Sequence, residues 1–330
     1  MSRNWIKTSL MATGATRLAG KWKGPGAAIL MYHSVLDDPQ RESQTLGKII
    51  HSTAVFSRHM ELIAREYVPV SLAEVACALA DGKELKPRSV VVTFDDGYSD
   101  NCEVAMPILN RIGIPATFYV TVECVETATL PWPSRLRHAF YTTRKISWND
   151  MNSGWPLADQ AQRDKAFLEA CDRCAGLAGE RQEDFVAGIE RTLEVDGQGT
   201  SRQLMMTWDQ VRELVTNGHI VGSHTLTHPN LAYLEEPVAR RELADSRRRL
   251  ENALHTPVVH FSYPCPALSP HWSRSTREWS REAGYQTAVT TQGGAVRRND
   301  DPLALRRVRP TKELDGLRWN LECTFLGRAM

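Results

Sequence analysis

The 330-residue sequence lacks several features that would place it in a special class of protein. It has no run of about 18 uncharged apolar residues, so no transmembrane helix is predicted, although peripheral contact with a membrane stays open. Its seven cysteines, an odd number with one close pair at Cys171 and Cys174, do not indicate an extracellular disulfide framework. We therefore expect a reducing, cytoplasmic setting.

Neither sign of charge is in excess, since 40 Lys and Arg residues stand against 39 Asp and Glu. This balance argues against a protein that binds nucleic acid. Internal repeats and low-complexity tracts are also lacking, and nothing in the sequence indicates an oligomeric state. The small and polar residues at 8–16, interrupted by Arg17, make a poor secretory signal. We expect a short amphipathic helix and a linker in an N-terminal extension over residues 1–25.

Two adjacent carboxylates, Asp95 and Asp96, end an apolar run at residues 90–92. The run predicts a buried strand, and parallel α/β folds place their chemistry at the carboxyl ends of such strands. Burying two neighbouring carboxylates is costly without a cation. An Asp-Asp-Gly turn is equally well explained as a helix cap, so this motif alone does not indicate a catalytic site.

A second apolar strand is followed by His224 and His228, four residues apart. One helical turn would place both imidazoles on the same side. Two histidines and one carboxylate form a common ligand set for a catalytic divalent metal that keeps an open position for water. Together with the Asp-Asp strand end, this pair predicts a metal centre.

The segments Thr-Phe-Asp-Asp-Gly-Tyr at 93–98 and His-Thr-Leu-Thr-His at 224–228 resemble two motifs of the polysaccharide deacetylase family, carbohydrate esterase family 4. The resemblance covers residues 26–120 and 205–312. The Met-Tyr-His run that ends at His33 is similar to that of the poly-N-acetylglucosamine deacetylases. The family implies hydrolysis of the N-acetyl group of an amino sugar in a polysaccharide, an oligosaccharide or an envelope or exopolysaccharide precursor.

The resemblance also implies roles for the motif residues. Asp96, His224 and His228 would hold one divalent metal ion, with zinc as the first choice and nickel, cobalt or manganese as alternatives. Asp95 would be the base that takes the proton of a metal-activated water. Two other interpretations stay open. One is an O-acetyl esterase or a hydrolase of a non-sugar amide with the same site, and the other is a catalytically weak sugar-binding relic.

Three further motifs of the family are degenerate here. The run at 261–266 matches the third motif without its arginine, and it implies Tyr263 in the wall of the site and the Cys265 N–H as an oxyanion donor. The fourth motif, a charged partner for the base, has no clear match near 284–291. The fifth motif normally supplies a histidine as general acid at a late strand, and residues 303–308, where we expect the last strand of the sheet, contain none.

His33 is our candidate for the missing acid, because it ends an apolar strand on the edge where Asp95 and His224 are expected. A nearby carboxylate should raise its pKa and keep it protonated. The alternative is that His33 packs against Tyr98 or caps a turn. Tyr98, which closes the first motif, is a further candidate for contact with the substrate. The histidines outside this set and the metal pair fall in loops, helices, strand starts or interiors.

Strands and helices alternate along the chain, which predicts a parallel, barrel-like sheet. The expected fold is α/β, a distorted (β/α)7-type barrel over residues 26–320 with a C-terminal tail over residues 321–330. The alternation is interrupted at residues 121–206, where two helical patterns predict a mainly helical insertion that overhangs the catalytic face.

This insertion is either a stabilising addition or a lid over the substrate. Its opening part mixes aromatic and cationic residues. If the insertion is a lid, Trp132, Arg135 and Arg137 are candidates for stacking on sugar rings and pairing with acidic groups.

Overall fold

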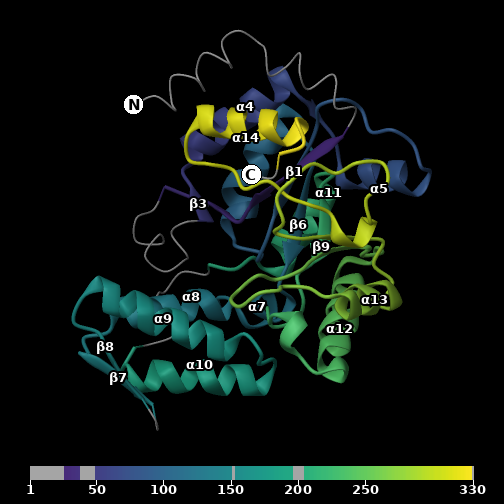
Figure 1. Ribbon diagram of the computed structural model, residues 1–330. Helices are drawn as coiled ribbons and strands as arrows, with labels where there is room; N and C mark the ends of the chain where they lie inside the picture. The colour runs from purple at the N-terminus through teal and green to yellow at the C-terminus, as the bar shows by residue number, and fades with distance from the viewer. Residues whose placement is uncertain (1–25, 38–48, 151–152, 196–203, 329–330) are drawn as a thin grey trace.

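The computed structural model describes residues 26–37, 49–150, 153–195 and 204–328. The helix predicted in the extension over residues 1–25 lies outside the described residues. Figure 1 shows a curled sheet surrounded by helices, with a second, mainly helical lobe beside it. Within the described part, every helix is too short or too polar to be a membrane span.

A parallel sheet forms the centre of the fold, in the strand order β1-β5-β6-β9-β10-β11, and β4 also pairs with β5. Side chains cover both faces of β5, so Val90, Val91 and Val92 are completely buried, as the apolar run predicted. The strands are β1 (Ala27–Tyr32), β4 (Val68–Pro69), β5 (Ser89–Phe94), β6 (Ala116–Val120), β9 (Ile220–Ser223), β10 (His260–Ser262) and β11 (Thr287–Val289).

The segment after β11 closes the sheet into a barrel. Leu305 forms a parallel bridge with Val289 of β11, and Val308 forms one with Leu30 of β1. The sequence predicted a strand over 303–308, but the chain instead forms a 3-10 helix, η4 (Pro302–Ala304), and then these single bridges. The closure is therefore irregular, which agrees with the distorted barrel expected from the sequence.

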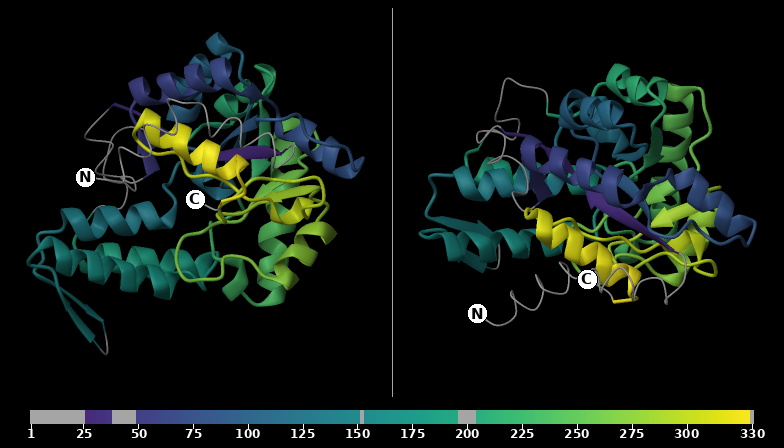
Figure 2. Two further views of the ribbon diagram at one scale, coloured as in Figure 1. Left: turned by 45° about the horizontal axis from the view of Figure 1, so that its top comes forward. Right: turned by 90° about the horizontal axis from the view of Figure 1, so that it is seen from above.

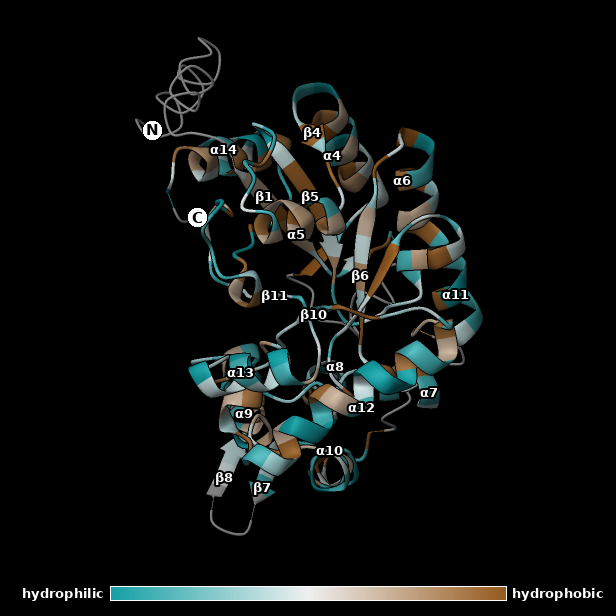
Figure 3. Cartoon of the chain, turned by 90° about the vertical axis from the view of Figure 1, so that its right-hand side faces the viewer, coloured by the Kyte–Doolittle hydropathy of each residue, from teal (hydrophilic) through white to brown (hydrophobic). Residues whose placement is uncertain are grey.

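Helices pack around the sheet, with their polar side outward, as the teal outer surface of α12 shows (Figure 3). The capping boxes at Ser71 and Thr207 begin two of them. The helices of the barrel are α4 (Thr53–Glu66), α5 (Leu72–Ala80), α6 (Met106–Ile112), α7 (Val122–Thr127), α11 (Trp208–Thr216), α12 (Glu236–Leu254), α13 (Arg274–Glu282) and α14 (Leu314–Phe325). Shorter elements are β2 (Ser34–Val35), β3 (Ile50–His51), the π-helix η2 (Asn101–Ala105) and the 3-10 helix η3 (Leu231–Tyr233).

The C-terminal tail predicted from residue 321 needs correction. Residues 314–325 form α14, which lies beside α4 (Figure 1). Leu321 and Phe325 are buried in the same apolar core as the strands. The apolar residues of this segment therefore belong to the barrel.

The insertion forms a lobe of its own, which extends away from the barrel in both views of Figure 2. The sequence predicted two helices, and the structure adds a third helix and a β-hairpin. Its elements are α8 (Trp132–Thr142), β7 (Ser147–Asp150), β8 (Ser153–Pro156), α9 (Gln160–Cys174) and α10 (Glu180–Thr192). The α8 helix packs against both others, and the lobe has a separate apolar core.

Candidate active site

A pocket of about 230 Å³ opens where the carboxyl ends of β1, β5 and β9 meet. The motif residues of both predicted segments line it, although they lie more than 100 residues apart in the sequence. The described residues that line the pocket are Met31, His33, Ile49, His51, Asp95, Asp96, Pro133, His224, His228, Tyr263, Cys265, Pro266, Thr291, Arg309 and Pro310.

Three buried donors converge in this pocket. One oxygen of Asp96 lies 3.5 Å from Nε2 of His224 and 3.3 Å from Nε2 of His228. One ligand atom from each residue lies within 4.8 Å of the other two. The structure thus brings together the three residues that the sequence analysis assigned to a metal.

The tautomer of His224 supports a cation between these donors. Its Nδ1 lies 2.7 Å from the carbonyl oxygen of Ser262, which can only accept a hydrogen bond, so Nδ1 carries the proton. A neutral imidazole then directs the lone pair of Nε2 toward the Asp96 carboxylate. Two lone pairs that face each other repel, whereas both can coordinate a divalent metal ion placed between them.

The two histidines do not lie on a helical turn, as the spacing suggested. Thr225 has φ +69° and His228 has φ +64°, so the segment is a loop that twice enters the left-handed region. That region is unfavourable for non-glycine residues, especially β-branched ones. The imidazoles nevertheless come together, with ring centroids 4.9 Å apart. The prediction was right about proximity and wrong about the local conformation.

Asp95 has a partner that the sequence analysis missed. Arg307 donates two hydrogen bonds to the Asp95 carboxylate, at 2.8 and 2.7 Å, and its side chain is fully buried. The charged partner of the base was sought near residues 284–291, but it comes from the irregular segment that closes the barrel. The sequence did contain a signal, since Arg307 lies between Leu305 and Val308 on a segment predicted to end at the catalytic edge.

The charges around the two carboxylates lower their pKa values. Burial alone would raise the pKa of Asp95, but the Arg307 guanidinium outweighs it and holds the pKa below its usual value. For Asp96, burial is likewise outweighed by His224 and His228 when their facing nitrogens carry protons, so its pKa then lies well below the usual range. Both groups are therefore carboxylates at neutral pH.

His33 lies in the pocket, as predicted, with Nε2 3.9 Å from one oxygen of Asp95. The expectation about its pKa was wrong: burial lowers the pKa of His33, although Asp96 and Asp95 both act to raise it. The sequence analysis also set aside His51, which lines the same pocket from β3. The chain folds back there, so only the structure could place this second imidazole.

The wall of the pocket includes both residues predicted from the third motif. Tyr263 lines the pocket, while its hydroxyl lies in the interior, within 3.2 Å of the carbonyl oxygen of Leu303. Cys265 lies farther out, and its Sγ is 2.9 Å from Nε2 of His271. The role of the Cys265 N–H as an oxyanion donor stays a prediction.

Three residues predicted to contact the substrate have other contacts. The Tyr98 hydroxyl lies 2.9 Å from Oγ of Ser134 in the interior. Trp132 is buried, and Arg135 forms ion pairs with two glutamates. None of the three lines this pocket, but Trp132 and Arg135 line a separate pocket of about 420 Å³, so the prediction that they contact the sugar stays a prediction. Arg137, the fourth candidate, stacks over the ring of Tyr141 within the lobe.

The family model described as polysaccharide deacetylase matches residues 82–166 and 178–288 of this chain. The polysaccharide deacetylase-like protein YxkH of Bacillus subtilis (strain 168) is 22% identical over 293 residues, which cover 87% of this chain and 72% of that protein. The poly-beta-1,6-N-acetyl-D-glucosamine N-deacetylase of Escherichia coli (strain K12) is 29% identical over 106 residues, which cover 32% of this chain and only 15% of that protein.

A solved structure shows the same fold. The deacetylase PplD of Streptococcus pyogenes superposes with a TM-score of 0.61 at 19% identity, and the match covers 92% of this chain and 99% of that chain. At 19% identity, this likeness shows the fold of the chain.

Proposed function

Because the chain belongs to the polysaccharide deacetylase family and is therefore a carbohydrate deacetylase, we propose that it hydrolyses the N-acetyl group of an amino sugar. The sugar would be part of a polysaccharide, an oligosaccharide or an exopolysaccharide precursor, and the products would be acetate and a free amine. The observation that carries the proposal is the convergence of Asp95, Asp96, His224 and His228 on one pocket. The name of the Escherichia coli relative supports an N-acetylated sugar as the substrate.

We assign Asp96, His224 and His228 to one divalent metal ion, with zinc as the first choice. Two imidazoles and one carboxylate suit zinc, nickel, cobalt or manganese, and they leave coordination positions for water and substrate. When bound, such an ion supplies Lewis acidity, which polarises a carbonyl group and makes water a nucleophile near neutral pH.

Asp95 is the proposed base. It follows β5 directly, so it lies beside Asp96 but has different partners, and its carboxylate is ionised and able to accept a proton. The two parallel hydrogen bonds from Arg307 fix the plane of this carboxylate. The neighbouring aspartates thus have different proposed roles: Asp96 is a metal ligand, and Asp95 is the proton acceptor.

His33 is the proposed donor of the proton that the leaving amine needs. Burial lowers its pKa, but the Asp95 and Asp96 carboxylates act in the opposite direction and stabilise the protonated imidazole. It lines the pocket on the same edge as Asp95 and is partly accessible, with 18% of its side chain exposed. His33→Ala should lower turnover by about 10²-fold and leave the metal content unchanged. His51→Ala is the matched variant, because it removes the other pocket imidazole outside the metal set. A larger loss in His51→Ala than in His33→Ala would transfer the role to His51.

The function is tested by stripping the purified chain with a chelator, adding back a single divalent metal, and following the release of amine and acetate. The substrates are N-acetylglucosamine oligomers and an O-acetylated sugar of similar length. We expect amine release that needs metal. Acetate release from the O-acetylated sugar alone would favour an esterase, and metal binding without release from either would favour a sugar-binding relic.

A further inference from the structure

The two proposed histidine ligands are fixed in different ways. The ring of His224 is held by its own hydrogen bond, from Nδ1 to the carbonyl oxygen of Ser262. The corresponding Nδ1 of His228 is buried and has no hydrogen-bond partner among the described residues. Because metal-ligating histidines normally gain their orientation through the second ring nitrogen, His228 must gain its orientation through its main chain.

The main chain at His228 has an unfavourable conformation. Thr225 and His228 both have positive φ, a conformation that is energetically unfavourable for residues other than glycine. The hydroxyl of Thr225 accepts a hydrogen bond from the His228 N–H at 3.0 Å, which ties the two strained residues together. The surrounding structure has to stabilise the loop for this conformation to persist.

Glu242 of α12 holds the loop from one side. Its carboxylate accepts hydrogen bonds from the N–H groups of Leu226 and Thr227, at 2.9 and 3.0 Å, and from the Thr227 hydroxyl at 2.7 Å. Glu242 is almost completely buried, so water does not compete for these bonds. A single side chain thus satisfies three donors from the residues between the two histidines.

Trp132, at the start of the insertion, holds the loop from the other side. Its indole Nε1–H donates to the carbonyl oxygen of His228 at 2.9 Å. Trp132 is itself buried in the core of the lobe, and Arg135, one turn later in α8, is fixed by Glu183 and Glu190 of α10. The position of this N–H therefore depends on the packing of the whole lobe.

We propose that Glu242 and Trp132 are positioning residues, which hold the loop of residues 224–228 from opposite sides and so orient His228 toward the metal ion. The inference rests on the proposed function, because it presupposes the metal site. It also gives the insertion a role in the site, since the buried indole of Trp132 in the lobe holds the main chain of the metal-binding residue His228.

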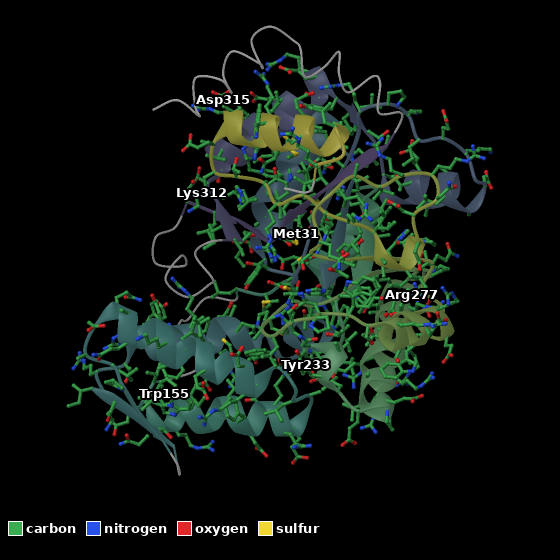
Figure 4. The ribbon with its side chains drawn as sticks, in the orientation of Figure 1. Met31, Trp155, Tyr233, Arg277, Lys312 and Asp315 are labelled. Atoms are coloured by element: carbon green, nitrogen blue, oxygen red, sulfur yellow. The ribbon has the colours of Figure 1, made fainter. Side chains whose placement is uncertain are left out.

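The test compares two variants with two controls. Glu242→Gln keeps the shape of the side chain but replaces one acceptor oxygen by an NH₂ group, and Trp132→Phe keeps an aromatic ring of smaller size but removes the N–H. Trp155→Phe is the matched control in the lobe, because its buried Nε1 has no hydrogen-bond partner among the described residues. Trp155 lies well away from Met31, which lines the pocket (Figure 4). Glu322→Gln, at a buried glutamate bound to Arg88, controls for loss of stability alone.

Zinc affinity is measured by chelator competition at pH 8, where Glu242 is ionised because burial raises its pKa only to about 7. The Tm of each metal-free chain and the visible absorption of its cobalt form are recorded alongside. We expect zinc affinity to fall 10- to 100-fold in Glu242→Gln and about tenfold in Trp132→Phe, with a changed cobalt spectrum in both. Trp155→Phe and Glu322→Gln should keep the wild-type affinity, even if Glu322→Gln melts earlier.

The outcomes separate this inference from the proposed function. If the wild-type chain binds zinc and both variants bind it equally well with an unchanged cobalt spectrum, the positioning roles are overturned and the function stands. If affinity falls only in proportion to Tm, and does so in Glu322→Gln too, the two residues merely stabilise the fold and the inference is again overturned. A wild-type chain that binds no divalent metal overturns the proposed function and this inference together.

Discussion

The catalytic edge of the barrel and the helical lobe carry similar kinds of residues and use them in opposite ways. At the edge, Asp95, Asp96 and two histidines point into a shared pocket. In the lobe, Arg135 is neutralised by Glu190 and Glu183, and the aromatic rings pack against each other. Parallel strands force the residues that follow them onto one edge, whereas a small helical lobe can satisfy its charges internally. Composition alone therefore indicates a site in the first region, whereas in the second it does not show which partner a charged side chain takes.

The lobe still touches the site at two neighbouring residues. Pro133 lines the pocket, and Trp132 donates to the main chain of His228. Both lie at the start of α8, where the lobe leaves the barrel. The rest of the lobe extends outward, as Figure 2 shows. Substitutions in the lobe that change turnover would contradict this contrast between the two regions, and substitutions there that change stability alone would support it.

The largest effect is expected at the catalytic edge. Asp95→Asn should lower kcat by about 10²–10⁴-fold, because it removes the proposed proton acceptor while Asp96 still binds the metal. Metal content by elemental analysis and turnover on an N-acetylglucosamine oligomer check this together. Near-normal turnover in Asp95→Asn would show that the division of roles between the two aspartates is wrong.

This edge is also where the sequence was most informative. Asp96, His224 and His228 could be predicted, because each directly follows or lies near an apolar strand whose carboxyl end must meet the others. Arg307 could not, since its segment forms single bridges instead of a regular strand and its partner is 212 residues away. His51 was missed for a similar reason: a two-residue strand carries too little pattern to be recognised.

In the lobe, the helices were predictable from their periodicity, but the orientation of Arg135 was not. An arginine among aromatic residues can face a ligand or a carboxylate on a neighbouring helix, and local sequence does not distinguish the two. Glu190 lies 55 residues later in the chain. Residue type gives the chemistry that a side chain can perform, and long-range packing decides whether it is free to do so.

The second largest effect is expected in the lobe. Arg135→Leu should lower the free energy of unfolding by about 3 kcal/mol, because it leaves the buried Glu190 without its partner. Urea denaturation measures this loss, and KM for the sugar oligomer should not change directly. Arg135→Leu/Glu190→Leu is the matched control, since removing both charges should restore much of the stability. A raised KM in the double variant, with stability restored, would return Arg135 to the substrate site.

A third difference should emerge with pH. Burial lowers the pKa of His260 on β10 to about 4, against about 6.5 in the unfolded chain. The native state therefore favours the neutral imidazole. Its contribution is fully present above pH 6.5 and is lost as the pH falls toward 4. The barrel should lose about 2 kcal/mol from this group between pH 7.5 and pH 5.0.

Urea midpoints at pH 7.5 and pH 5.0 measure that loss, and His260→Gln should reduce it by the same amount. The insertion contains one histidine, His138, so cleavage within residues 121–206 should be less sensitive to acid than cleavage in the barrel. Limited proteolysis at the two pH values measures cleavage in the insertion and in the barrel separately. Equal acid sensitivity of wild type and His260→Gln would assign the pH dependence to other groups.

The smallest effect is expected where the two regions meet. Tyr98 follows the Asp-Asp motif, yet its hydroxyl is buried against Oγ of Ser134 in the lobe. Tyr98→Phe removes one buried hydrogen bond and should cost about 1 kcal/mol of stability. Ser134→Ala removes the same bond from the other side, and in a double-mutant cycle the two changes should couple. kcat/KM should stay within about twofold of the wild type, because neither group lines the pocket. A tenfold loss of kcat/KM in Tyr98→Phe alone would show that Tyr98 acts in the substrate site, and that the contrast drawn between the two regions is wrong at this residue.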